Sequence, residues 1–174
     1  MKKNLFWWTF SAFATTSLLG TLLHFVFDWS GGNVLVAPFS AVNESTWEHM
    51  KLAFFPMVAF AIFQRIWYKK VANYWQIKTV AILIALFLVP ALFYTVKGVV
   101  GKVPDWVNIV EFFVVLLAAY GWEYLHFLQL GKAVKSWICL LVLAVIAVAF
   151  GVFTFFPPNL AIFVDPVTLG RGIV

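Results

Sequence analysis

The stretch NESTWEHMKLAFFPMVAFAIFQRIW, residues 43–67, joins a polar heptad to an apolar segment of nearly membrane-spanning length. The heptad, Asn43 to His49, holds three of the ten Asp, Glu and His residues of the chain. The apolar run that follows extends from Leu52 to Trp67. Charge beside a membrane helix costs free energy unless it is paired or used. This junction therefore indicates both a fold class and the place where chemistry is to be sought.

The composition of the chain is that of a membrane protein. Of its 174 residues, 64% are hydrophobic and 11% are charged, and the mean hydropathy is +0.96. Charged residues make up about a quarter of an ordinary soluble domain. At about 20 residues per crossing, the chain is long enough for several membrane helices but too short for an added soluble domain. We expect one helical domain over residues 1–174.

Five apolar stretches are predicted to form transmembrane helices, which gives an all-α fold. They cover roughly residues 5–27, 47–67, 77–96, 107–127 and 134–155, and an extended tail follows at 157–174. Each is close to the length that crosses about 30 Å of hydrocarbon. Membrane strands would instead alternate in polarity over about ten residues and close as a barrel.

The basic residues predict the orientation of these helices. The net charge of +5 and the pI near 9.4 do not indicate nucleic-acid binding, because the bases lie in the short gaps between apolar runs, as topology signals do. A cytoplasmic N-terminus places eight bases inside: Lys2, Lys3, Arg65, Lys69, Lys70, Lys78, Lys132 and Lys135. The four outside bases are Lys51, Lys97, Lys102 and Arg171. We therefore expect a C-terminus outside, in a bacterial cytoplasmic membrane, with the lipid bilayer as the partner.

The first apolar run also has some features of a signal peptide. Met1-Lys2-Lys3 precedes it, but it is longer than a usual signal-peptide core and lacks a clear small-x-small cleavage site before Asp28. An uncleaved first helix is expected.

The polar residues predicted to lie at the outer leaflet form the candidate site. Burying an ionisable group in a membrane costs several kcal/mol on most scales, so each such group is a functional candidate. Topology places six of them on one side together with the amide of Asn43; the seven residues are His24, Asn43, Glu44, Glu48, His49, Glu111 and Asp165. The apolar tail residues Leu160, Ile162 and Phe163 could cover this site as a lid or lie at the headgroups.

Two readings of the heptad remain open. Histidines and carboxylates could hold Zn²⁺, Mn²⁺ or Fe²⁺, and the spacing of Glu44 and Glu48 puts them on one face of a helix. The pattern is weaker than His-Glu-x-x-His, in which both histidines share a face. Alternatively, Ser45-Thr46-Trp47-Glu48 matches a capping box, which leaves His49 and Glu111 unexplained.

A second polar cluster is predicted near the inner end of the fourth segment. Tyr120, Glu123 and His126 share one helical face. Glu-x-x-His occurs in di-iron bundles, but those need two such motifs and two further Glu. A polar contact that stabilises helix packing, or a place at the interface, is the favoured role.

The chain resembles an uncharacterised family of small bacterial multi-pass membrane proteins. The resemblance rests on residues 24–31, on residues 39–56 with their Asn-Glu-Ser-x-Trp-Glu-His motif, on Glu123, and on the tail around Phe155 to Asn159. It covers nearly the whole chain. The family usually closes with Gly-x-Tyr-Gly-Ile, whereas Arg171 stands here in place of the tyrosine. The resemblance implies an integral membrane protein and no established activity.

Three hypotheses about function follow. The first is a protein that binds or transports a cation or a small polar molecule in an outer pocket. The second is a small membrane enzyme in which Glu48 or Glu111 acts as acid or base beside a metal or His49. The third is an accessory or scaffold subunit whose polar groups only cap and join helices. Cofactor, protein partners and substrate are not indicated by the sequence.

Overall fold

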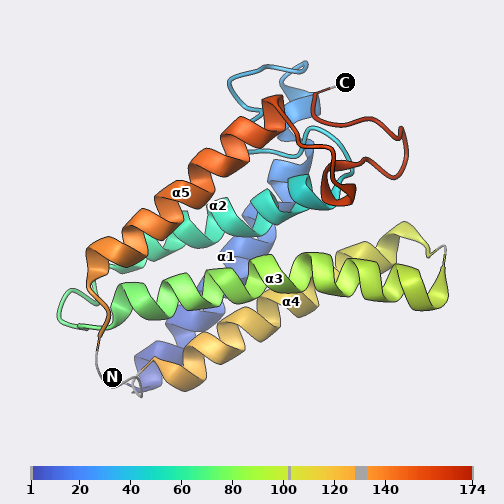
Figure 1. The fold of residues 1–174 in the computed structure, drawn as a ribbon. Helices are drawn as coiled ribbons and strands as arrows, with labels where there is room; N and C mark the ends of the chain where they lie inside the picture. The colour runs from blue at the N-terminus through green and yellow to red at the C-terminus, as the bar shows by residue number, and fades with distance from the viewer. Residues whose placement is uncertain (1, 102, 128–132, 174) are drawn as a thin grey trace.

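The computed structural model describes residues 2–101, 103–127 and 133–173 (Figure 1). Over these residues the protein is all-α, as the sequence predicts. Five long helices form it: α1 (Lys2–Trp29), α2 (Thr46–Gln64), α3 (Tyr74–Val100), α4 (Asp105–His126) and α5 (Ser136–Phe155). A 3₁₀ turn, η1 (Ala161–Phe163), interrupts the tail. The five expected segments agree with these helices to within four residues at each boundary.

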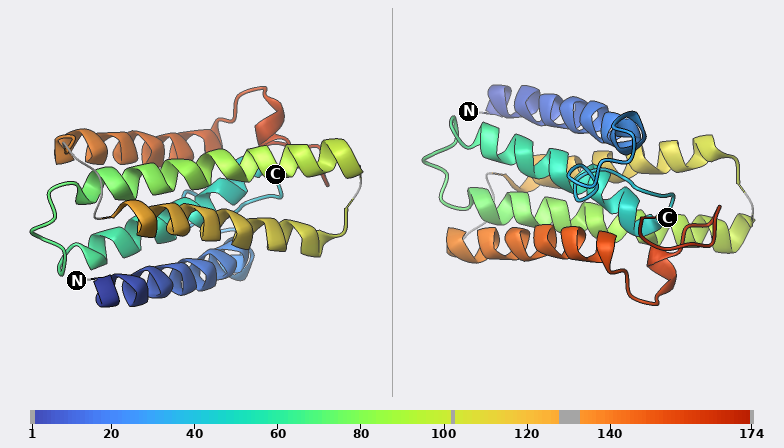
Figure 2. Two further views of the ribbon diagram at one scale, coloured as in Figure 1. Left: turned by 90° about the horizontal axis from the view of Figure 1, so that it is seen from below. Right: turned by 90° about the horizontal axis from the view of Figure 1, so that it is seen from above.

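The helices run back and forth between two ends of a bundle (Figures 1 and 2). One end, here called the N-terminal end, carries the start of α1 and the α2–α3 connection. The other, the tail end, carries the 30–45 loop, the α3–α4 connection and the C-terminal tail. Helix α2 occupies the middle, because it packs against α1, α3 and α5.

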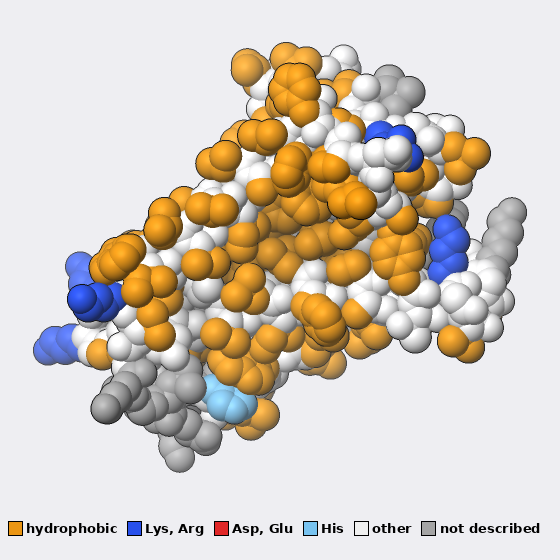
Figure 3. Space-filling view, in the orientation of Figure 1, with side chains coloured by type: hydrophobic (Ala, Val, Ile, Leu, Met, Phe, Trp, Pro, Cys, Tyr) orange, Lys and Arg blue, Asp and Glu red, His pale blue; other side chains and the backbone are white. Residues whose placement is uncertain are grey.

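Hydrophobic side chains cover the visible face of the bundle, and Lys and Arg gather near its ends (Figure 3). Among the described residues, four helical stretches are long and apolar enough to cross a membrane: Asn4–Trp29, Tyr74–Val100, Trp106–His126 and Ser136–Phe155. Helix α2 is not among them, because it carries polar residues such as Glu48, Lys51 and Gln64. These three side chains are buried against the surrounding helices. The long helix that does not qualify as a membrane span by itself is therefore well shielded by its neighbours.

A buried ion pair and a buried hydroxyl pair lie near the N-terminal end. Lys78 of α3 forms an ion pair with Glu123 of α4, and these side chains are only 3% and 1% exposed. Beside them the Tyr120 hydroxyl lies 2.6 Å from the Thr16 hydroxyl of α1. We call these four residues the sealed cluster. It matches the expectation that Tyr120 and Glu123 join helices, although Lys78 was expected to be an exposed topology signal.

His126, the third member of the predicted polar face, lies outside the sealed cluster. Its Nδ1 contacts the Trp122 carbonyl oxygen at 2.8 Å, and its ring stacks on the Trp122 indole. The di-iron alternative therefore finds no support in this region.

Candidate functional site

A cavity of about 680 Å³ lies at the tail end between α1, α2, α3 and α4. The far ends of α3 and α4 diverge there from α2 and the tail (Figure 1). Four ionisable side chains line the cavity together with polar and apolar groups: His24, Glu44, His49 and Glu111, with Thr21, Thr46, Asn108, Leu52, Val89, Phe93 and Phe112. The sequence placed these four ionisable groups on one side, and the structure brings them to one cavity.

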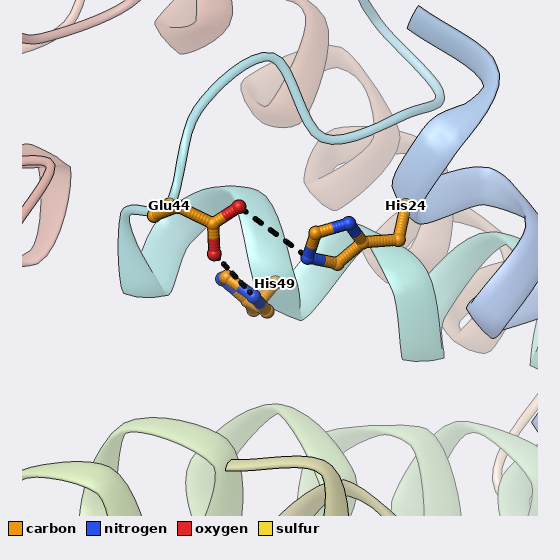
Figure 4. A group of neighbouring side chains, drawn as sticks. All are labelled: His24, Glu44 and His49. Atoms are coloured by element: carbon orange, nitrogen blue, oxygen red, sulfur yellow. Dashed lines mark ion pairs between the residues drawn. The ribbon is translucent and has the colours of Figure 1, made fainter. Parts of the chain in front are cut away.

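Two histidines face one carboxylate in this cavity. His24 Nε2 lies 3.6 Å from Glu44 Oε1, and His49 Nε2 lies 3.5 Å from Glu44 Oε2. Each oxygen of the Glu44 carboxylate thus points toward one of the two rings (Figure 4). The ring centroids are 5.2 Å apart. One ligand atom from each residue can be chosen so that all three lie within 4.8 Å of one another. We call His24, Glu44 and His49 the histidine–glutamate cluster.

The electrostatics of this cluster keep Glu44 ionised. Contact with the His24 ring and the charge of the two imidazoles lower the pKa of the Glu44 carboxyl from its ordinary value, although burial opposes them. A lowered pKa means that the stabilising contact is present above the ordinary pKa and is lost as pH falls through the lowered one. Near neutral pH the loop therefore presents an anion to both rings.

Close helix packing positions His24. A Cβ atom on Gly20 would come within 2.6 Å of the Leu52 carbonyl oxygen and 2.7 Å of the Phe112 ring. Glycine therefore lets α1 approach α2 and α4 closely, as small residues do in membrane bundles. His24 follows one helical turn later and reaches the first turn of α2.

Helix capping positions His49. Ser45 is the N-cap of α2, and its hydroxyl accepts a hydrogen bond from the Glu48 amide at 3.4 Å. The Asn43 side chain accepts from the Ser45 amide at 2.8 Å. His49 Nδ1 then contacts the Ser45 carbonyl oxygen at 3.0 Å. The prediction that Ser45 caps α2 is therefore confirmed. The carbonyl oxygen of the same residue also orients the His49 ring.

The prediction that Glu44 and Glu48 share a helical face is wrong. The helix begins after Ser45, so Glu44 belongs to the loop and turns toward the cavity. Glu48 points into the protein, where it forms an ion pair with Lys51 and accepts from the Thr154 hydroxyl at 3.2 Å. Oε2, the oxygen that pairs with Lys51, also accepts from the Val42 amide at 3.0 Å, and Glu48 does not close the capping box on Ser45.

Lys51 completes this buried group, which we call the lysine cluster: Glu48, Lys51 and Thr154. The Lys51 ammonium donates to the Ala37 carbonyl and to the Thr154 hydroxyl, both at 2.8 Å. Glu48 is 1% exposed, and Lys51 is fully buried. A buried carboxylate with these partners holds the 30–45 loop and α5 to α2 and is not available to a ligand. Glu48 is therefore not a residue of the cavity, in contrast to the sequence prediction.

Asn43 and Asp165 hold the tail in place and do not line the cavity. The Asn43 side chain donates to the Gly172 carbonyl at 2.7 Å. Asp165 is buried and accepts from the Val167 amide and the Thr168 hydroxyl, at 2.7 and 2.9 Å. These bonds use their polar atoms in turns, so neither side chain is free for a ligand.

The tail nevertheless covers part of the cavity. Pro166 and Val167 are among its lining residues, and Phe163 is buried against Trp47. Leu160, in contrast, is 58% exposed. Gly172 has φ of +68°, and a Cβ there would meet the Thr154 carbonyl oxygen at 2.9 Å. A covering role of the tail is thus supported for Pro166 and Val167, whereas Phe163 anchors the tail on Trp47 and Leu160 is exposed.

Glu111 enters the cavity from α4 without a protein partner. Its Oε1 atom is buried and makes no hydrogen bond to any described residue. Asn108, one helical turn earlier, lines the same cavity. A buried carboxylate oxygen without a partner is costly and calls for an explanation such as a ligand, an ion or water.

Sequence reasoning missed several functional and structural neighbours of the site. Asn108 could have been found from its spacing of three to Glu111, and Lys51 from its spacing of three to Glu48. The partners Thr154 and Lys78 carry no such local signal, because they lie far along the chain from Glu48 and Glu123.

Comparison with known protein families finds a match over nearly the whole chain. The model of a family of unknown function, DUF6512, matches residues 1–173. The chain belongs to this family. This confirms the predicted resemblance to an uncharacterised family. No curated protein and no solved structure shows significant similarity to the chain.

Proposed function

We propose that this DUF6512 protein is a five-helix protein of the bacterial cytoplasmic membrane that binds a cation or a small polar molecule in the tail-end cavity. The observation that carries the proposal is the convergence of His24, Glu44, His49 and Glu111 on one cavity of about 680 Å³. Convergent polar groups in a largely apolar cavity are the usual mark of a ligand site.

Charge favours a cationic ligand. Two carboxylates, from Glu44 and Glu111, enter the cavity, and the lowered pKa of Glu44 keeps that group anionic. Asn108 and Thr21 add neutral polar atoms to the lining. Towards the N-terminal end, buried Ala53, Met57 and Leu116 belong to the packed core. This supports binding in the cavity more than passage through the bundle.

In the membrane, α2 would be the fifth spanning helix, shielded by its neighbours. The predicted orientation puts the N-terminal end in the cytoplasm and the tail end outside. A reporter fused after Val174 should be active only outside the cytoplasm, and one fused after α2 only inside. A C-terminal reporter that is active in the cytoplasm would contradict this topology.

Binding is tested on the full-length protein, purified in detergent without a polyhistidine tag. Thermal unfolding is followed with Zn²⁺, Mn²⁺, K⁺ and ethanolamine as separate probes. At least one probe should raise the unfolding temperature of the wild type, because a ligand that binds only the folded state stabilises it. The double variant E44Q/E111Q should lose that response.

Asp28→Asn is the matched control. Asp28 is an exposed acid at the same end of the bundle and is not among the lining residues of the cavity. It should retain the full response. The proposal fails if no probe stabilises the wild type, or if E44Q/E111Q responds as strongly as D28N.

A second candidate function is a membrane-embedded, metal-dependent enzyme. The histidine–glutamate cluster beside the unpaired Glu111 carboxylate favours it, because a metal and a nearby acid or base are the parts that hydrolytic metal sites need. Of the two carboxylates nominated from the sequence, only Glu111 remains for proton transfer, since Glu48 is held by Lys51. Loss of turnover in E111Q with metal binding retained would support this reading over simple binding.

A further inference from the structure

The histidine–glutamate cluster has the geometry of a transition-metal site. We propose that His24 Nε2, Glu44 and His49 Nε2 bind one divalent transition-metal ion of the zinc class, with a fourth coordination position open to the cavity. This inference rests on the proposed function and names the ligand of that same cavity.

The separations between ligand atoms fit a metal better than a direct contact. The two nitrogen–oxygen distances are 3.6 and 3.5 Å. Both exceed the range of about 2.7–3.2 Å in which a nitrogen donor makes a good hydrogen bond. Zinc lies about 2.0–2.2 Å from nitrogen and oxygen ligands, so two ligands of a tetrahedral ion are about 3.3–3.5 Å apart. Each nitrogen–oxygen distance is close to this separation, and one ligand atom from each of the three residues lies within 4.8 Å of the other two.

The tautomer of His49 supports the same conclusion. Its Nδ1 lies 3.0 Å from the Ser45 carbonyl oxygen, which can only accept, so Nδ1 carries the proton. In the neutral ring the lone pair is then on Nε2, which faces Glu44 Oε2. In the neutral form, two acceptors therefore face each other, and a cation between them would relieve their repulsion. Metal-binding histidines usually have this arrangement, with the distal ring nitrogen donating to a carbonyl or a carboxylate.

The donor set selects the metal. Two imidazoles and one carboxylate suit zinc and its first-row neighbours, whereas Mg²⁺ and Ca²⁺ prefer oxygen ligands alone. Three protein ligands leave one position for water or substrate, as in catalytic zinc sites. Here that position faces the cavity that Asn108 and Glu111 also line.

The three ligands come from separate parts of the chain. His24 belongs to α1, Glu44 to the 30–45 loop and His49 to the first turn of α2. Their side chains are 29%, 47% and 27% exposed, which leaves a route for an ion. A bound ion would tie α1 and the loop to α2, so it should also stabilise the folded protein.

The test is a zinc titration of the tag-free, full-length protein after treatment with a chelator. We expect one Zn²⁺ per chain by elemental analysis and a tetrahedral absorption spectrum when Co²⁺ replaces zinc. H24Q, E44Q and H49Q should each weaken Zn²⁺ binding at least about tenfold, because even the loss of a residue that only supports a ligand costs that much. Mg²⁺ should not compete.

His126→Gln is the matched control. His126 makes the same Nδ1 contact to a carbonyl oxygen four residues earlier, but it lies at the other end of the bundle. It should bind Zn²⁺ as the wild type does. The unfolding temperature of each chelated variant shows whether it is folded. Wild type without stoichiometric Zn²⁺, or folded ligand variants that keep wild-type affinity, would overturn the metal site.

Failure of the metal site and failure of the proposed function give different results. If ethanolamine or K⁺ stabilises the wild type and not E44Q/E111Q, while Zn²⁺ does not bind, the cavity is a ligand site without a metal. If no probe binds, both proposals fail. If Zn²⁺ binds, and E111Q retains that binding while H24Q, E44Q and H49Q lose it, the metal is held by the three proposed ligands.

Discussion

The two ends of the bundle differ in whether a buried carboxylate is paired with a cationic side chain. At the N-terminal end, Lys78 and Glu123 neutralise each other within a packed interior. At the tail end, Glu111 lies in a cavity with one oxygen unpartnered, and Glu44 faces two imidazoles across gaps of about 3.5 Å. In the first arrangement the charge of Glu123 is offset by Lys78, although the Glu123 Oε2 atom has no hydrogen-bond partner among the described residues. In the second, Glu111 has no ion-pair partner among the described residues.

This difference separates structural from functional polar residues in a membrane protein. Charge placed inside a bundle costs free energy, and pairing with another helix offsets part of that cost. The lysine cluster shows that the distinction depends on surroundings and not on position, because Glu48 and Lys51 are sealed although they lie at the tail end. Three predictions test the comparison.

Breaking the sealed cluster should have the largest effect on stability. Lys78→Met leaves Glu123 as an unpaired buried carboxylate, which should cost about 3–5 kcal/mol. The readout is the unfolding temperature in detergent. The double variant K78M/E123L should recover most of the loss, because an apolar pair can replace a buried ion pair.

Lys97→Met is the control for this prediction. It makes the same substitution on the same helix at an exposed position and should change stability by no more than about 0.5 kcal/mol. A K78M variant as stable as K97M would show that Lys78 and Glu123 do not form the sealed pair.

Breaking the lysine cluster should have an intermediate effect. Thr154→Val removes a hydroxyl that accepts from Lys51 and interacts with Glu48, and should cost about 1–3 kcal/mol. Thr79→Val is the matched control, because the Thr79 hydroxyl is buried without a hydrogen-bond partner in the described structure. T79V should be at least as stable as the wild type. If T154V and T79V lose the same amount of stability, the conclusion that Glu48 is a structural residue is wrong.

The smallest effect, and one of opposite sign, is expected in the cavity. Glu111→Met removes a carboxylate oxygen that has no partner, so stability should rise by about 0.5–1 kcal/mol, as it does when strained functional residues are replaced. Cation binding should weaken in the same variant. Glu123→Met, the same substitution in the sealed cluster, should lower the unfolding temperature. If E111M and E123M lose the same amount of stability, Glu111 is a structural residue like Glu123, and the comparison between the two ends fails.

Much of the fold was predictable because its signals are local. Unbroken apolar runs predicted five helices, and Ser45 predicted the start of α2. Of the seven candidate site residues, four line one cavity: His24, Glu44, His49 and Glu111. Asn43, Glu48 and Asp165 were assigned by their side of the membrane, and that criterion cannot tell a side chain that enters a cavity from one used in a turn or an ion pair.

The sequence by itself determined that the protein is helical, with helices apolar enough to cross a membrane, and where those helices begin and end to within four residues. Hydrophobic length and helix caps depend on neighbours in the chain, so a single sequence suffices for them. The tertiary structure alone decided that Lys78 is the buried partner of Glu123, that Thr154 joins Glu48 and Lys51, and that His24 meets Glu44 and His49. Those pairings depend on how the helices approach one another and rotate about their axes. Close contacts such as that at Gly20 set this arrangement. No pattern of neighbouring residues encodes it.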